Sequence, residues 1–175
     1  MLNNIYKADI LRYGMGEGKS HATRFLYWFR TAQYTKSIIV RSFARLMLNH
    51  YRKKYGLEIP RQTKIGAGLY IGHAYNITMN ENTVMGINCN IHKGVTIGQE
   101  NRGRRKGVPT IGNCVWIGVN ASIVGNITVG DDVLIAPNSY VNCGIPSHSI
   151  VFGTPCIIKE RENATEGYIN RKVNM

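Results

Sequence analysis

The sequence of 175 residues lacks any apolar run close to the ~20 residues that a transmembrane helix needs. No signal peptide is expected either, because the N-terminal stretch carries charge among the apolar residues and has no small-residue cleavage site. We therefore expect a cytoplasmic protein. Hydrophobic residues make up 43% of the chain, which suits one well-buried domain with an appendage.

Metal-binding and nucleotide-binding signatures are missing as well. The four cysteines, at positions 89, 114, 143 and 156, form no CxxC pair, so no zinc site or other metal is expected. Neither a P-loop nor a G-x-G-x-x-G stretch occurs among the 19 glycines. The glycine content is therefore no sign of a phosphate-binding loop.

Acidic residues are scarce, since 10 Asp and Glu stand against 22 Lys and Arg, for a formal charge of +12. The positive excess lies in residues 1–57 and 99–110, and the remaining charges cancel. It consists of two local patches and not of a general basicity.

What the sequence does contain is a six-residue repeat. A β-branched aliphatic residue stands at every sixth position from Ile111 to Val141, and Ile65, Ile71 and Ile77 keep the same spacing in another phase. Neither the helix period nor strand alternation gives this spacing, so it predicts very short strands joined by tight turns. Three such units close a coil of about 18 residues, and stacked coils form a parallel β-helix.

The repeat is interrupted twice, near residues 78–84 and at residues 99–110. The second stretch, QENRGRRKGVPT, is polar, basic and rich in glycine, so we expect a loop that bulges out of the coil. Loops on a rigid scaffold often carry binding residues, although a tolerated surface insertion is the alternative.

The flanks of the repeat predict different structures. Residues 1–57 are expected to form a helical cap, with a short helix over 3–13 and one long helix over 21–55 whose apolar residues share a face. Arg30, Arg41, Arg45 and Arg52 share another face, which is either solvated or docks on anionic lipid headgroups. In the tail, 159–175, the first turn is expected to pack on the last coil and the rest to be mobile.

The repeat resembles that of hexapeptide-repeat acyltransferases over about residues 58–160, in the serine acetyltransferase-like branch, which is close to enzymes that acetylate capsule or exopolysaccharide sugars. The resemblance implies a mainly β fold, a left-handed parallel β-helix over 58–158. It also implies acetyl-CoA as co-substrate and a homotrimer, with a hexamer as the alternative. The branch carries an acid and, after fourteen residues, a catalytic histidine. These positions are Glu58 and His73 here, so His73 is the expected general base and Glu58 the acid that orients it.

Two departures from that pattern concern the acceptor. The carboxylate that directly precedes the family's histidine is Gly72 here, and the family's basic pair in the loop is replaced by Gly107 and Val108. Both changes remove charged contacts that an amino acid needs, which favours a sugar acceptor. The polar loop residues that we expect to bind an acidic sugar or a phosphate are Asn101, Arg102, Arg104, Arg105 and Lys106.

The resemblance also implies a groove for acetyl-CoA between neighbouring subunits. By position, its walls and phosphate contacts are Gly118, Val119, Ala136, Pro137, Asn142, Lys159 and Arg161.

The expected function is therefore O-acetyl transfer from acetyl-CoA to a sugar hydroxyl in surface polysaccharide or glycoconjugate synthesis, at the inner face of the membrane if the basic helix docks there. L-Serine is the alternative acceptor. A non-catalytic β-helix that binds an anionic partner is the alternative of another class. Nucleic acid is not expected, because no stacking aromatic residues punctuate the basic loop.

Overall fold

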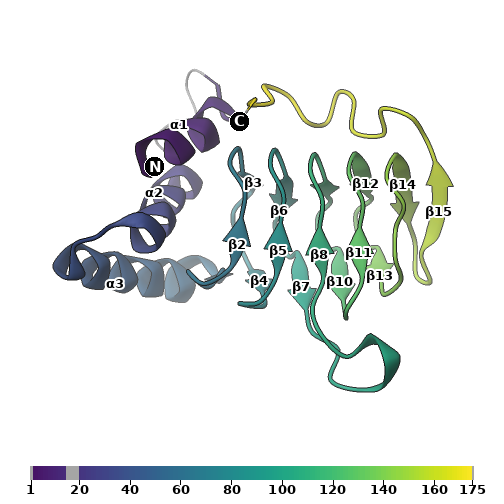
Figure 1. Ribbon diagram of the computed structural model, residues 1–175, viewed down its shortest axis with the longest axis horizontal. Helices are drawn as coiled ribbons and strands as arrows, with labels where there is room; N and C mark the ends of the chain where they lie inside the picture. Colours follow the sequence, from purple (N-terminus) through teal and green to yellow (C-terminus); the bar gives the residue numbers. More distant parts are fainter. Residues whose placement is uncertain (1, 15–19, 175) are drawn as a thin grey trace.

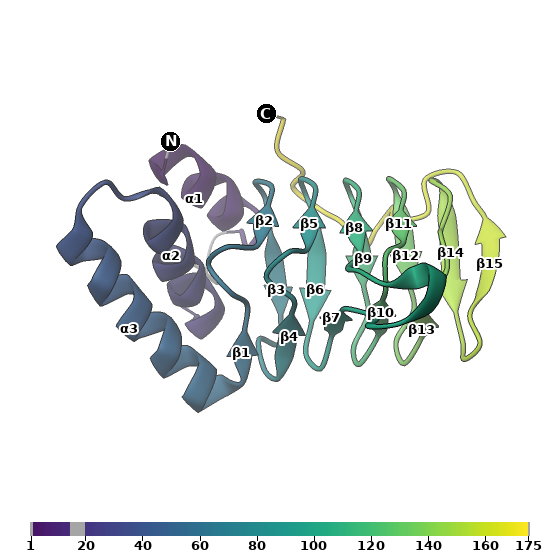
Figure 2. The ribbon, with the colours of Figure 1, turned by 60° about the horizontal axis from the view of Figure 1, so that its bottom comes forward.

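In the computed structural model, which describes residues 2–14 and 20–174, three α-helices stand at one end of a column of stacked β-coils (Figures 1 and 2). The helices are α1 (Leu2–Leu11), α2 (His21–Tyr34) and α3 (Ile38–Tyr55). The expected N-terminal helical group thus lies against the first coil.

The coils build three parallel sheets, which confirms the predicted parallel β-helix. Sheet A contains β1 (Leu57–Glu58), β4 (Ile77–Met79), β7 (Thr96–Gly98), β10 (Ser122–Val124) and β13 (Tyr140–Val141). Sheet B contains β2 (Lys64–Ile65), β5 (Val84–Met85), β8 (Thr110–Ile111) and β11 (Thr128–Val129). Sheet C contains β3 (Tyr70–Gly72), β6 (Asn90–His92), β9 (Trp116–Ile117), β12 (Val133–Ile135), β14 (Ser149–Phe152) and the antiparallel β15 (Ile157–Glu160).

The repeated aliphatic residues point into the core as ladders. In sheet C the paired residues are Ile71, Ile91, Ile117, Ile135 and Val151, each at most 1% exposed. Each coil thus covers the apolar face of the next, and the outward side chains between the ladder positions are free to carry other chemistry.

The first interruption of the repeat lies at the corner between sheets C and A, before the stretch that the sequence indicated. The ladder residue of sheet C, Ile71, is eight positions before the ladder residue of sheet A, Met79. In the next coil the corresponding residues, Ile91 and Ile97, are six positions apart. The two additional residues therefore fall within the corner that contains His73. The second interruption is a protruding loop, as predicted, with the 3₁₀ helix η1 (Gly103–Arg105) at its tip and a bridge between Glu100 and Gly107 at its base (Figure 1).

The prediction of one helix over 21–55 is wrong. The chain becomes extended at Thr35, and the hydroxyl of Ser37 accepts a hydrogen bond from Val40 N to begin α3. Ser37 is an ordinary N-cap residue, so this break had a sequence signal that the apolar spacing concealed. α3 ends at Gly56, which has a left-handed φ of 66°.

The helices cap the open end of the first coil with buried polar side chains. Asp9 and Arg30 form an ion pair of 2.8 Å, and both side chains are fully buried. Arg30 Nη1 and Nη2 donate to the carbonyl oxygens of Ile65 (2.8 Å) and Gly66 (2.7 Å), and Leu69 N donates to Asp9. The expectation that Arg30 belongs to an exposed basic face is therefore wrong, because backbone groups of an end coil need partners.

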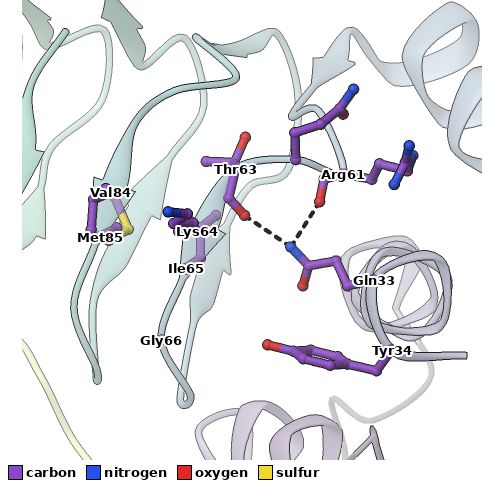
Figure 3. A pocket seen from close by; sticks show the side chains of 10 residues that line it. Gln33, Tyr34, Arg61, Thr63, Lys64, Ile65, Gly66, Val84 and Met85 are labelled. Carbon is purple, nitrogen blue, oxygen red and sulfur yellow. Dashed lines mark hydrogen bonds between the residues drawn. The ribbon is translucent and has the colours of Figure 1, made fainter.

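Gln33 of α2 completes this cap on the neighbouring turn. Its Nε2 donates to the carbonyl oxygens of Arg61 (3.0 Å) and Thr63 (2.8 Å), at one side of a pocket of about 430 Å³ between α2 and the first coil (Figure 3).

α3 leaves much of its apolar face uncovered. Ile39 is 82% exposed, Leu46 is 66% exposed and Phe43 is 51% exposed. In this helix only Ala44 and Tyr51 are buried.

The tail after β15 runs back along the corner between sheets B and C toward the helices (Figure 1), so its contacts extend well beyond the first turn that was expected to pack on the last coil. The Asp132 carboxylate accepts hydrogen bonds from Ala164 N and Thr165 N, both at 3.0 Å. Further along, Val173 N donates to Asn88 Oδ1 at 2.9 Å.

Candidate functional site

His73 lies at the widened corner between sheets C and A. It directly follows β3, its φ is 49°, and its side chain is exposed. The ring makes no hydrogen bond within residues 2–14 and 20–174, so both ring nitrogens are available to a bound molecule. The stacked coils position the backbone of this corner, and the imidazole extends from it to the surface.

His92 lies beside this corner on the next coil and was not among the sequence-predicted site residues. Gly72 and His92 are paired across β3 and β6. A β-carbon on Gly72 would lie 2.7 Å from His92 Nε2 and still closer to Cδ2. The imidazole of His92 thus fills the space above Gly72. The Ile ladder carried a usable signal, because aligning Ile71 with Ile91 places His92 next to Gly72.

The tautomer of His92 is fixed by its surroundings. Its Nδ1 lies 2.7 Å from the carbonyl oxygen of Ile117, which only accepts hydrogen bonds, so Nδ1 carries the proton. Burial, together with the nearby His73, holds the pKa of His92 below its usual value, although the Ile117 carbonyl opposes the shift. The ring is therefore neutral at pH 7, with an unprotonated Nε2.

Glu58 stands at the end of β1 in sheet A, and its side chain is exposed. It lines a pocket of about 610 Å³ between α3 and the first coil, together with Arg45, Arg52 and Arg61. No hydrogen bond joins it to His73 among the residues that the structure describes. The fold places the two residues in the same coil without forming the predicted contact.

The residues predicted for acetyl-CoA separate into groups. Gly118, Val119, Ala136 and Pro137 adjoin one another at the corner between sheets C and A, where Gly118 N donates to Ile135 O at 2.8 Å and a β-carbon at Gly118 would lie 2.6 Å from Pro137 N. This is the corner that contains His73, so the first four predicted residues and the expected base share one edge of the column.

The other three predicted acetyl-CoA residues lie elsewhere. Lys159, on β15, places its Nζ 5.6 Å from the ring of Phe152. Arg161 is tied by its backbone N to His148 O, at the corner between sheets B and C. Asn142 follows β13, at the corner between sheets A and B. A single chain therefore does not gather all seven residues around one ligand.

The basic loop also leaves the column at the corner between sheets A and B (Figure 2). The predicted substrate-binding side chains Asn101, Arg102, Arg104, Arg105 and Lys106 are all exposed. Within one chain, the loop and His73 are therefore on different edges of the triangular column.

A pocket of about 270 Å³ opens on the outer face of sheet C, between the N-terminal segment and the tail. Tyr70, His92, Trp116 and Tyr168 line it. The rings of His92 and Trp116 are 4.7 Å apart, and those of Trp116 and Tyr168 are 5.1 Å apart. His92 thus stands between this aromatic pocket and the His73 corner.

Within the described ranges, 2–14 and 20–174, no three or more His, Cys, Asp and Glu side chains gather in a way that would hold a metal ion. The helices found in those ranges are too short or too polar to cross a membrane.

Comparisons with known proteins agree with the hexapeptide-repeat fold. The family described as bacterial transferase hexapeptide (six repeats) matches residues 109–143. A serine acetyltransferase of Helicobacter pylori is 39% identical over 108 residues, which are 61% of this chain and 63% of that protein. The chain thus matches less than two thirds of the length of that relative.

Solved structures show the same similarity over more of the chain. The serine acetyltransferase of Neisseria gonorrhoeae in complex with serine is 26% identical, with a TM-score of 0.74, and the match covers 90% of this chain and 69% of that one. The serine acetyltransferase of Brucella abortus in complex with coenzyme A is 25% identical, with a TM-score of 0.76, and the match covers 91% and 68%. The resemblance of this chain to the hexapeptide-repeat acyltransferases, in their serine acetyltransferase-like branch, is therefore confirmed.

Proposed function

We propose that the protein is an O-acetyltransferase that moves an acetyl group from acetyl-CoA to a hydroxyl group, with His73 as the general base. The observation that carries this proposal is the exposed ring of His73, which has no hydrogen-bond partner within the described ranges, at the edge that also holds Gly118 and Pro137. The relative from Brucella abortus, which was solved with coenzyme A, supports acetyl-CoA as the donor.

The proposed reaction is a direct transfer. A ring nitrogen of His73 takes the proton of the acceptor hydroxyl while the oxygen bonds to the thioester carbon. The carbon–sulfur bond then breaks, and the thiolate of CoA leaves with the proton from the imidazolium. The acceptor becomes an ester, CoA leaves as a thiol, and His73 returns to its neutral form without a metal or a covalent enzyme intermediate.

Glu58 is proposed to orient the imidazole of His73 during this step. Both side chains are exposed, so either can rotate when ligands bind. Catalytic hydrogen bonds are often long or absent before the substrate is in place, which reconciles the role with the missing contact.

L-Serine is the acceptor that the relatives' names support best, so we place it ahead of the sugar hydroxyl that the sequence led us to expect first. A sugar remains the second candidate because of one local observation. The position before His73 is Gly72, and His92 fills the space above it, so no carboxylate is available there for the ammonium group of serine. Aromatic rings of the kind that line the adjacent pocket also suit the faces of a sugar.

The remaining site residues are proposed to meet between subunits of a homotrimer, with a pair of trimers as the larger alternative. The basic loop and Asn142 lie on the edge between sheets A and B, and Arg161 lies on the edge between sheets B and C, so a neighbouring column is needed to bring them toward the His73 edge. In such an assembly Lys159 and Arg161 would neutralise phosphates of acetyl-CoA.

The exposed apolar face of α3 is proposed to contact the inner face of the membrane. The proposed location of the protein is therefore the cytoplasm, at the surface of that membrane. Ile39, Phe43 and Leu46 supply apolar surface, and Arg41 and Arg45 supply positive charge on the same helix. Apolar area combined with basic residues is the composition that binds anionic lipid surfaces.

Release of the CoA thiol from acetyl-CoA tests the proposed function. The purified protein is supplied with L-serine, with a panel of methyl hexopyranosides, or with no acceptor. Release that depends on one acceptor identifies the reaction and the acceptor together. No acceptor-dependent release, combined with retention on an anionic polymer, would instead support the non-catalytic alternative.

A further inference from the structure

The edge of His92 that faces the His73 corner has no function in the reaction described so far. Nδ1 is occupied by the carbonyl oxygen of Ile117 at 2.7 Å, whereas Nε2 makes no hydrogen bond among the described residues. The side chain is only partly exposed, and Trp116 packs on the ring at 4.7 Å. A neutral imidazole held in this way presents one hydrogen-bond acceptor in a fixed direction.

The position of that nitrogen relates it to the base. Nε2 would be 2.7 Å from a β-carbon on Gly72, and Gly72 is bonded to His73. His92 and His73 are also close enough to influence each other's charge. A molecule whose hydroxyl reaches His73 therefore brings its neighbouring atoms over Gly72, toward Nε2 of His92.

We propose that His92 is an acceptor-positioning residue, and that its Nε2 accepts a hydrogen bond from a donor on the carbon next to the one that carries the reacting hydroxyl. This inference rests on the proposed acetyl transfer. The chemical class it selects is a hydroxyl with a vicinal donor, which includes the 1,2-amino alcohol of L-serine and the vicinal diol of a sugar. An acceptor without that donor leaves Nε2 unpaired and is bound more weakly.

Two substitutions distinguish the roles of the two ring nitrogens of His92. His92→Asn keeps an amide donor near the Nδ1 position, so the contact with Ile117 O is retained while the acceptor at Nε2 is lost. His92→Gln places an amide oxygen near the Nε2 position. We expect His92→Asn to raise the acceptor KM about 10-fold with kcat within about threefold, and His92→Gln to recover part of that loss.

Discrimination between matched acceptors gives a readout that a merely structural role would not change. Wild-type protein should prefer L-serine over 3-hydroxypropionate, or a methyl hexopyranoside over its vicinal deoxy analogue, and His92→Asn should remove that preference. The pair of acceptors that is turned over shows whether the hydrogen-bond donor to Nε2 is the ammonium group of serine or a hydroxyl group of a sugar. Unchanged KM and unchanged preference in His92→Asn would overturn the proposal.

Nitrogen NMR of histidine-labelled protein tests the binding step without turnover. We expect His92 to carry its proton on Nδ1, and its Nε2 resonance to shift when the acceptor is added. A proton on Nε2, or no shift with any compound of the panel, would overturn the inference. Absence of turnover together with a clear Nε2 shift would contradict the acetyl transfer while leaving the binding role in place.

Discussion

The imidazole of His92 occupies the space in which a side chain at Gly72 would have to lie, with Nε2 2.7 Å from the position of a β-carbon. Gly72 does not have a positive φ, so glycine is required here by the neighbouring ring and not by backbone conformation. The loss of the family's acid at this position has therefore not left an open space beside His73. The space belongs to a second histidine.

This relationship predicts strong coupling between the two positions. Gly72→Ala should lower the free energy of unfolding by about 1–3 kcal/mol, because the new methyl group overlaps His92. In a His92→Ala background the same change should cost much less, since the overlapping ring is gone. Urea denaturation of the four proteins measures the coupling, and an equal cost of Gly72→Ala in both backgrounds would refute it.

Removal of one partner from the buried ion pair between Asp9 and Arg30 should cause a large loss of stability. Arg30→Met removes the partner of Asp9 and two hydrogen bonds to the carbonyl oxygens of Ile65 and Gly66. We expect the free energy of unfolding to fall by about 3–5 kcal/mol, because a buried carboxylate is left without its cation. Arg24→Met, at an exposed position of α2, is the control and should change stability by less than about 0.5 kcal/mol.

The tail should be held most firmly at mildly acidic pH. Burial alone would raise the pKa of Asp132, but hydrogen bonds from Thr165, His148 and Ala164 lower it overall, so its contribution is lost as pH falls through that lowered pKa. The hydrogen bond to Asp132 raises the pKa of His148, so its contribution is lost as pH rises through that raised pKa. The backbone amides of residues 161–174 should therefore stay protected from hydrogen exchange from about pH 4 to at least about pH 6.5.

Hydrogen exchange, corrected for the intrinsic effect of pH, measures this protection. Asp132→Asn should expose the tail across the whole range, whereas Asp131→Asn should not, because the Asp131 carboxylate accepts its hydrogen bonds from Asn113. Tail protection that is indifferent to both pH and Asp132→Asn would show that the anchor lies elsewhere.

The apolar face of α3 predicts binding to vesicles of phosphatidylglycerol and phosphatidylcholine. Phe43→Asp should reduce cosedimentation of the protein with the vesicles several-fold, because it places a charge in the contact. Leu11→Asp is the matched control, because Leu11 is an exposed leucine of α1 that lies outside that face. A different result would contradict this prediction. If the wild type does not bind vesicles, and light scattering shows that Phe43→Asp loses self-association, the face belongs to a contact with a second copy of the chain.

The repeat made the β-helix predictable, because an inward aliphatic residue is needed once on each side of every coil. The burial of Arg30 was not predictable from helical spacing, since its partners are backbone groups of Ile65 and Gly66 that are exposed only at an open coil end. The anchoring of the tail depends on Asp132, a corner residue distant in sequence. His73 was identified through a motif, whereas His92 required the register between two coils.

The most direct test of the account is the turnover of acetyl-CoA by His73→Ala with the acceptor that the wild type uses. General-base catalysis contributes roughly 10²–10⁴-fold, so turnover should fall by that factor while binding of CoA, measured by calorimetry, is unchanged. Glu58→Gln should cost less, because orienting the ring is only part of the effect. Wild-type turnover in His73→Ala, with the acceptor dependence intact, would contradict the central claim.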